Sequence, residues 1–428
     1  MSFGPEELER RKQQRQQHQQ KRAREQKQFK LRLIIAGVAL VITAVVILVA
    51  VFMGSSHADT PTPTDTAPSQ TGTVSTAPVQ TEPPTGKTVI RFTAAGDLNI
   101  SDKVVNSGGS SINYTDMISD VLPVLADADL TTINFEGNLV GAPYGTATSS
   151  APLQILQALR IAGVDMIQMA NSRCINNGII GLNTTLTAIR SAGIEPVGAY
   201  ATNAEFEKSG GYTIWEVRGV RVAVVAFTKG MDNMALPVGS EKCVNLLYND
   251  YSSKYVDVDT DGITDILKRV SKEKPDVTIA LLHWGSEYND TRSTSQNKIR
   301  DLLLENGVDV IIGTHPHYVQ PIEFDEKAGT LIAYSLGDFV SDAERMGTEY
   351  GIILNVEITK DNATGETAVT GYEYIPTYSY EDEDGMMRVL RIDPAIFAYE
   401  FNYLDRVSRE VYDDLKNAKS RIEARVKP

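Results

Sequence analysis

Residues 277–317 read VTIALLHWGSEYNDTRSTSQNKIRDLLLENGVDVIIGTHPH and set out a strand, a helix and a second strand. The strand-forming stretches, 277–285 and 308–317, are apolar without alternation, as in strands covered on both faces of a sheet. Between them, residues 296–305 have the spacing of a helix. An apolar strand, a helix and another apolar strand indicate an α/β domain.

The same alternation continues along the chain on both sides of this unit. Further strands are expected at 88–97, 126–139, 163–171, 194–199, 211–228 (a hairpin), 330–339 and 350–358, and further helices at 151–162, 182–192 and 263–272. We therefore predict one α/β domain over residues 88–378. Beyond it, residues 381–385 (EDEDG) predict a solvated turn and residues 398–426 a charged helix. Residues 379–428 are expected to form a C-terminal helical extension.

The first 87 residues predict a membrane tether. Residues 1–32 hold ten Lys or Arg and four Glu, a charge of +6, and residues 33–53 hold no charge. These apolar residues would span ~30 Å as a helix, the thickness of a hydrocarbon core. The positive-inside rule places the N-terminus in the cytoplasm and the C-terminal domain outside, in a single-pass cell-membrane protein. A cleaved signal peptide is the alternative, which the length of the apolar run disfavours. Residues 54–87, rich in Pro and Thr, predict a disordered linker.

The charge of the chain disfavours one class of partner. The whole sequence carries −14, so the part after the basic tail carries −14 − 6 = −20. An acidic surface of this size repels phosphate backbones, and we expect no nucleic-acid partner.

The two cysteines and one acidic stretch can each be interpreted in two ways. Cys174 and Cys243 either form one disulfide or remain two buried thiols. Residues 257–262 (DVDTDG) resemble the start of an EF-hand loop, but Lys268 stands where that loop needs a bidentate Glu. We favour an acidic loop that caps the following helix.

Nitrogen and oxygen donors stand at the ends of several expected strands. They are Asp97, Glu136, His283, His315 and His317. Taken alone, a carboxylate in such a place is usually a turn or cap residue, and a histidine is usually packed and hydrogen-bonded. In α/β sheets, however, ligands gather outside the carboxyl ends of strands. Imidazole and carboxylate together suit Zn, Mn or Fe, so the set predicts a divalent transition-metal site of one or two ions.

The strings that carry these donors resemble the CapA (PgsA-like) capsule-synthesis family, which has the fold of the calcineurin-like metallophosphatases. The resemblance covers about residues 89–357 and includes AAGDLNIS (94–101), DADLTTINFEGNL (127–139), HWGSEY (283–288), GTHPHYVQPIE (313–323) and YSLGDF (334–339). It implies a metallophosphatase-like α/β/β/α sandwich. It also implies that Asp97 is the first-strand carboxylate ligand, that Glu136 is the bridging carboxylate, and that the three histidines are metal ligands.

The third motif departs from the family pattern. The family usually has Ala-Asn-Asn-His, whereas residues 170–173 read Ala-Asn-Ser-Arg. Ser172 thus stands at an amide-ligand position, and Arg173 replaces a histidine that can protonate the leaving group. An arginine cannot donate that proton near neutral pH, but it can hold an anion. Arg173 is therefore our candidate catalytic-site residue, with the role of orienting substrate.

Three more residues complete the expected site. Asn171 and Asn99 are candidate substrate-binding residues beside the donors. Asp338 stands where the family usually has Asn, and we expect it to pair with Arg173.

Two functions compete. The first is a metal-dependent phosphoester or amide hydrolase; the resemblance implies poly-γ-glutamate capsule or another cell-envelope polymer as its substrate. The alternative is a non-catalytic module of the same fold that binds envelope polymer or a capsule synthase subunit in the membrane. Metal content, measured in the protein and in a His315→Ala variant, separates them.

Overall fold

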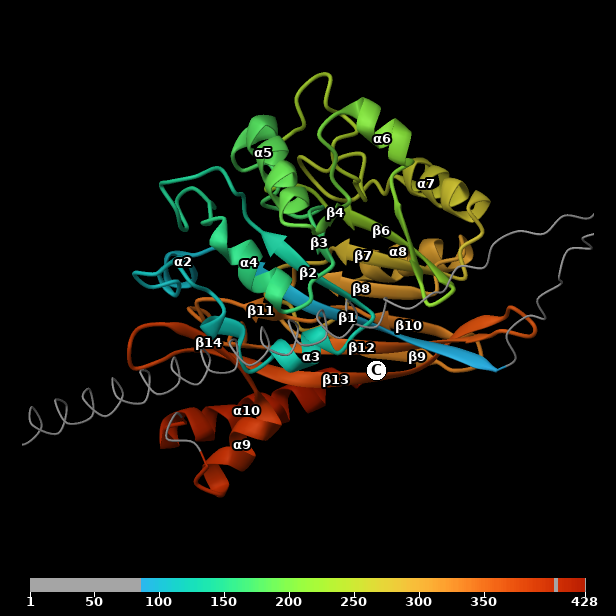
Figure 1. Ribbon diagram of the computed structural model, residues 1–428. Coiled ribbons are helices and arrows are strands. Elements are labelled where there is room, and N and C mark those ends of the chain that lie inside the picture. The colour runs from blue at the N-terminus through green and yellow to red at the C-terminus, as the bar shows by residue number, and fades with distance from the viewer. Residues whose placement is uncertain (1–85, 404–406, 428) are drawn as a thin grey trace, which may run out of the picture. The chain divides into compact units, whose positions relative to one another are not determined.

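The computed structural model describes residues 86–403 and 407–427, which form two β-sheets covered by helices (Figure 1). The expected basic tail (1–32), the membrane helix (33–53) and the linker as far as residue 85 lie outside these residues. The described ranges include no helix with both the length and the apolar content needed to cross a bilayer. The α/β class predicted from the sequence is confirmed.

The larger sheet has eight strands and contains the start of the domain. Its order is β14-β13-β12-β1-β2-β3-β4, with β11 pairing beside the end of β1. Strands β1 to β4 run parallel, whereas β12, β13 and β14 are antiparallel. The bounds are β1 (Lys87–Asn99), β2 (Leu130–Glu136), β3 (Met166–Gln168), β4 (Glu195–Val197), β11 (Asp338–Val340), β12 (Tyr350–Asp361), β13 (Thr367–Glu381) and β14 (Met387–Arg391). Strand β13 runs across the boundary expected at residue 378.

The smaller sheet has six strands in the order β5-β6-β7-β8-β10-β9. They are β5 (Thr213–Val217), β6 (Val220–Thr228), β7 (Val277–His283), β8 (Val310–Thr314), β9 (Ile322–Asp325) and β10 (Thr330–Ala333). The expected hairpin is β5 and β6, joined at Arg218 and Gly219, which have φ of 51° and 82°. Positive φ at both connecting residues is typical of the two-residue hairpin turn whose twist matches that of the flanking strands. Strands β6, β7, β8 and β10 are parallel.

Helices follow most of the parallel strands. They are α2 (Asp102–Asn106), the 3-10 helix η1 (Asp116–Ile118), α3 (Leu122–Ala126), α4 (Gln154–Ile161), α5 (Gly178–Ser191), α6 (Asn203–Ser209), α7 (Thr260–Lys272), α8 (Thr294–Glu305), α9 (Ile392–Glu400) and α10 (Arg409–Arg425). At the start of α7, the Asp259 side chain accepts a hydrogen bond from the Gly262 amide at 2.9 Å. The acidic stretch therefore caps this helix, as we favoured from the sequence.

Burial along β6 shows how the layers stack. Val222, Val224 and Ala226 join the core shared with the larger sheet. The alternate residues Ala223, Val225 and Phe227 join a second core. That second core includes apolar residues of α7 and α8, such as Leu267 and Ile299. The smaller sheet is thus covered on both faces, while α9 and α10 pack below β13 (Figure 1).

Two details correct or settle expectations. The single helix expected at 398–426 is wrong, because α9 ends at Glu400 and a new helix starts after Ser408. The Ser408 side chain caps α10 by accepting from the Val411 amide, and Asn402 has a left-handed φ of 57° that is incompatible with a continuous helix. Cys174 and Cys243, the two cysteines of the sequence, are free and buried, so the thiol alternative holds.

Candidate metal centre

The donors predicted from the sequence lie where strands of both sheets end. Asp97 lies near the end of β1, Glu136 ends β2, His283 ends β7, and His315 follows β8. Gly96 permits the close approach that brings β1 to the edge of this site, because a Cβ there would lie 1.9 Å from the Gly337 carbonyl oxygen. All four donor residues are buried.

Asp97, Glu136 and His317 form the first group of donors, with one ligand atom from each lying within 4.8 Å of the others. Asn134 holds the two carboxylates together, since its amide nitrogen lies 2.5 Å from Asp97 Oδ1 and 3.4 Å from Glu136 Oε1. Burial raises the pKa of Asp97, and burial with the charge of Asp97 raises the pKa of Glu136 well above its usual value. Adjacent buried carboxylates are costly unless a cation balances them.

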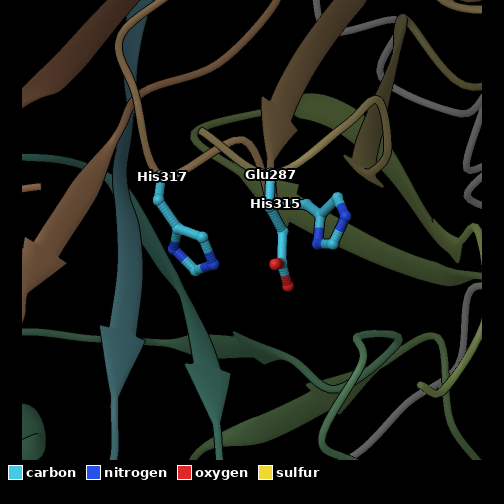
Figure 2. Close-up of side chains that lie close together, drawn as sticks. All are labelled: Glu287, His315 and His317. Carbon is cyan, nitrogen blue, oxygen red and sulfur yellow. The ribbon is translucent and has the colours of Figure 1, made fainter. Parts of the chain in front are cut away.

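Glu287, His315 and His317 form a second group within the same 4.8 Å limit. Figure 2 shows the Glu287 carboxylate between the two imidazole rings. Neither ring nitrogen of buried His315 has a hydrogen-bond partner among the described residues. Burial lowers the pKa of His315 well below its usual value, so its ring is neutral. A buried, neutral and unpartnered imidazole is an available metal ligand, and the residues present therefore fit a divalent ion.

His283 lies between the two groups. Its Nε2 is 3.5 Å from Glu136 Oε1, and the centres of the His283 and His315 rings are 4.5 Å apart. Burial lowers the pKa of His283 well below its usual value. Its Nε2 also lies 3.0 Å from the Ser172 hydroxyl. All five donors predicted from the sequence thus converge, joined by Glu287.

The backbone of the His-Pro-His segment aims both histidines at this point. His315 and His317 have φ of 92° and 58°, in the left-handed region that costs a non-glycine residue about 1–3 kcal/mol. The surroundings hold this conformation, because the His315 amide donates to Asp97 Oδ2 at 3.0 Å. The Tyr288 amide also donates to the Pro316 carbonyl at 2.8 Å.

Asp338 contacts His317 and not Arg173, so the ion pair expected between Asp338 and Arg173 is wrong. Its Oδ1 lies 2.8 Å from His317 Nδ1. Burial alone would lower the pKa of His317, but the Asp338 charge and hydrogen bond raise it well above its usual value. Burial raises the pKa of Asp338 to about 6. Strand β11 places Asp338 beside Asp97 in the interior.

Arg173 is instead half-exposed and pairs with Asp232, with 3.8 Å between its Nε and Asp232 Oδ2. Beside it opens a cavity of about 490 Å³. The cavity is lined by Ser172, Lys229, Gly230, Asp232, Asn233, Tyr255, Ser286, Glu287 and His315. The Lys229 ammonium donates to the Gly285 carbonyl at 3.0 Å and lies 4.6 Å from the Tyr255 ring centre. Glu287 and His315 are therefore reachable from a hollow that has the Lys229 ammonium in its wall and the Arg173 guanidinium beside it.

The two candidate substrate-binding asparagines lie in the same region. Asn171 is fully buried, and its amide nitrogen donates to Asn134 Oδ1 at 3.0 Å and to the Phe135 carbonyl at 2.8 Å. Asn99 pairs in register with Glu136 across β1 and β2. The structure gives Asn171 a supporting position behind the carboxylates.

Sequence reasoning missed Glu287 and Asn134. Glu287 lies four residues after His283 in an exposed loop, and Asn134 lies two residues before Glu136 on the same face of β2. The period of two along a strand could have suggested Asn134. Nothing in the pattern around Glu287 indicated that its loop folds back over the histidines.

Comparison with known proteins gives a consistent family. Residues 91–343 match the family model described as bacterial capsule synthesis protein PGA_cap. A capsule biosynthesis protein CapA from Bacillus anthracis is 28% identical over 291 residues, which are 64% of this chain and 65% of that protein. A PGA biosynthesis protein CapA from Bacillus subtilis (strain 168) is 26% identical over 255 residues, which are 58% of this chain and 63% of that protein. The match thus spans less than two thirds of either relative.

Among solved structures, the chain is similar to the calcineurin-like phosphoesterase YfkN from Bacillus subtilis. The TM-score is 0.42 at 14% identity, over 79% of this chain and 99% of that one.

Proposed function

The chain belongs to the PGA_cap family of bacterial capsule synthesis proteins, and from this we propose that it acts in the synthesis of poly-γ-glutamate capsule or a related cell-envelope polymer. The relatives whose names refer to capsule and PGA biosynthesis support the proposal. We further propose that residues 33–53 anchor it in the cell membrane, with the tail inside. The linker would then hold the domain outside the cell, beside capsule synthase subunits.

We propose that the domain is a metal-dependent hydrolase. The observation that carries this is the convergence of buried carboxylates with histidines, one of which has both ring nitrogens unpartnered. Asp97, Glu136, His283, His315, His317 and Glu287 would hold one or two ions of Mn, Zn or Fe. A divalent ion there would supply Lewis acidity and lower the pKa of a water molecule, which suits hydrolysis of a phosphoester or amide.

The surrounding residues prepare that site. Asp338 fixes the ring of His317 through its hydrogen bond, and Asn134 aligns the two carboxylates. Arg173 and Lys229 flank the cavity and would attract an anionic group of the substrate. Because an arginine does not release its proton near neutral pH, the leaving group would take its proton from water.

One contact favours the second function, a non-catalytic module that binds polymer or a synthase subunit. Ser172 Oγ lies 3.0 Å from His283 Nε2, the nitrogen nearest Glu136. The chain itself can therefore satisfy a nitrogen that a metal would otherwise use. In that case the cavity would hold a polymer end without cleaving it.

The test measures metal content and hydrolysis on the full chain in detergent. We expect bound transition metal in the wild type, its loss in His315→Ala and Asp97→Ala, and cleavage of poly-γ-glutamate only by the loaded protein. His57→Ala is the matched histidine control and should retain metal. Bound metal without cleavage of any envelope polymer would support the second function, the non-catalytic binding module. Equal metal content in all variants would exclude the site.

A further inference from the structure

The C-terminal end of α10 contacts the loops that carry the candidate ligands. Arg425 Nη2 donates to Asp290 Oδ2 at 3.2 Å. Its guanidinium carbon lies 4.8 Å from the centre of the Tyr318 ring and 5.5 Å from that of Tyr350. We propose that Arg425 is a positioning residue that fixes these loops for cation binding. This inference rests on the metal site proposed above and gives the C-terminal helix a role in it.

The first loop, residues 284–293, follows β7 and is here called the Glu287 loop. It carries Glu287, a candidate ligand, together with Tyr288 and Asp290. The Tyr288 ring stacks on the ring of His317, with 5.5 Å between centres and 27° between planes. Arg345 covers the Tyr288 ring, at 3.7 Å from its centre. Asp290 thus ties to Arg425 a loop that already touches a histidine of the site.

The second loop, residues 315–321, is here called the His-Pro-His loop. Tyr318 follows His317 directly, and its hydroxyl donates to the Met346 carbonyl at 2.7 Å. Its ring also meets the Tyr288 ring edge to face, 6.0 Å between centres. Because Arg425 covers Tyr318 and pairs with Asp290, one side chain spans both loops.

Two further contacts make Arg425 a fixed support. The Val426 carbonyl accepts from the Ile322 amide at 3.0 Å, which pins the end of α10 to the start of β9, directly after the His-Pro-His loop. Tyr350 begins β12, whose Gly351 forms a bridge with Gly337, the neighbour of Asp338. The Arg425 side chain therefore also packs against β12, a third element that borders the site.

The chemistry of Arg425 explains why this position needs an arginine. Its side chain is only 18% exposed, and its Nη1 has no hydrogen-bond partner among the described residues. Burying such a group is unfavourable unless other contacts offset it. A planar guanidinium can stack on two rings while one edge binds a carboxylate, whereas a lysine ammonium offers only a point charge. The contacts thus favour a positioning role over a chance surface ion pair.

The consequence concerns the left-handed histidines. The loop conformation at His315 and His317 is unfavourable by itself and persists because its neighbours hold it. Loss of Arg425 would remove the side chain that joins Tyr318 to Asp290 and loosen the packing of the Glu287 loop against His317. Gln320 would still tie the two loops, because its side-chain nitrogen donates to the Asn289 and Thr291 carbonyls at 2.8 and 3.1 Å. Residues that support metal ligands typically change affinity about 10–100-fold when removed, and we expect the lower end, about tenfold.

The test titrates Co²⁺ into the full chain and follows its visible absorption, which reports coordination geometry. We expect Arg425→Ala to bind Co²⁺ about tenfold more weakly with an altered spectrum, and Arg425→Lys to recover little of the affinity because it cannot stack. Arg409→Ala is the matched control, because Arg409 lies at the other end of α10 and forms its ion pair, among the described residues, with Asp413 of the same helix. Wild-type affinity and spectrum in Arg425→Ala would overturn the proposal while leaving the metal site intact.

A second measurement does not depend on metal. Hydrogen exchange of the amides of Tyr288 and His315 should speed up in Arg425→Ala and stay unchanged in Arg409→Ala, with thermal unfolding recorded for each. If the wild type binds no Co²⁺, the proposed metal site fails, and this exchange alone decides whether Arg425 holds the loops. Unchanged exchange would reject that role.

Discussion

Asp338 is the main group that raises the pKa of His317. Its carboxylate lies 2.8 Å from His317 Nδ1 and, together with the charges of Glu136 and Asp97, outweighs the effect of burial. We predict that Asp338→Asn lowers the pKa of His317, because the nearest negative charge is lost. An NMR pH titration of the histidine ring measures this directly. The control is Asp342→Asn, four residues later, which should leave the His317 titration in place; an unshifted titration in Asp338→Asn would show that other carboxylates dominate.

The buried carboxyl groups make cation binding depend on pH. Burial raises the pKa of Asp97 and Glu136, and Asp338 raises that of His317, so all three hold protons above the pH at which the free groups release them. A metal must displace these protons, and its affinity should therefore rise with pH and be lost as pH falls. Titrations of Mn²⁺ from about pH 5 to about pH 8 test the sign. A flat profile would mean that these groups have already released their protons over this pH range.

The individual donors could be predicted because each stands at the end of an apolar strand. Their partners could not, as Asp338 shows: the sequence suggested Arg173 on charge alone. The structure instead places Asp338 on β11 beside Asp97, a pairing between residues 241 positions apart (338 − 97) that no local pattern encodes. Glu287 was missed for the same reason, since only the fold brings its exposed loop over His315.

Helix α7 depends on one cap for its start. Asp259 accepts from the Gly262 amide, one of the donors that a helix leaves unpaired at its beginning. We predict that Asp259→Ala lowers the free energy of unfolding by about 1 kcal/mol, as measured by urea denaturation. Asp261→Ala, in the first turn of the same helix, removes an acidic residue without removing the cap and should cost less. Equal losses of unfolding free energy in the two variants would mean that the charge, and not the cap, stabilises the helix.

Elements with one strong period were predicted well, and elements with mixed signals were not. Helix α8 was predicted at 296–305 and spans Thr294–Glu305, where the Ser293–Gln296 capping box fixes its start. Strand β13 was missed, since Gly371 and Pro376 within it are residues that ordinarily argue against a strand. Pairing with β12 and β14 along its length overrides that local preference.

At the scale of the molecule, net charge opposes the proposed substrate. The sequence after the basic tail carries −20, and poly-γ-glutamate is itself an anion. We predict that association with the polymer quickens when salt rises from about 10 mM to about 150 mM, because the Debye length falls from ~30 Å to ~8 Å and repulsion weakens. Stopped-flow measurement of the association rate tests this. A rate that falls with salt would mean that Arg173 and Lys229 dominate the encounter.

The donors of the site span residues 97 to 317 and come from strands of two different sheets. A cation held there would link the two sheets, and its binding site exists only once both sheets have formed and packed against each other. Metal binding would therefore indicate that folding is complete, and unfolding would require release of the ion. At a free-ion concentration of 100 times Kd this would add ~2.7 kcal/mol to the free energy of unfolding.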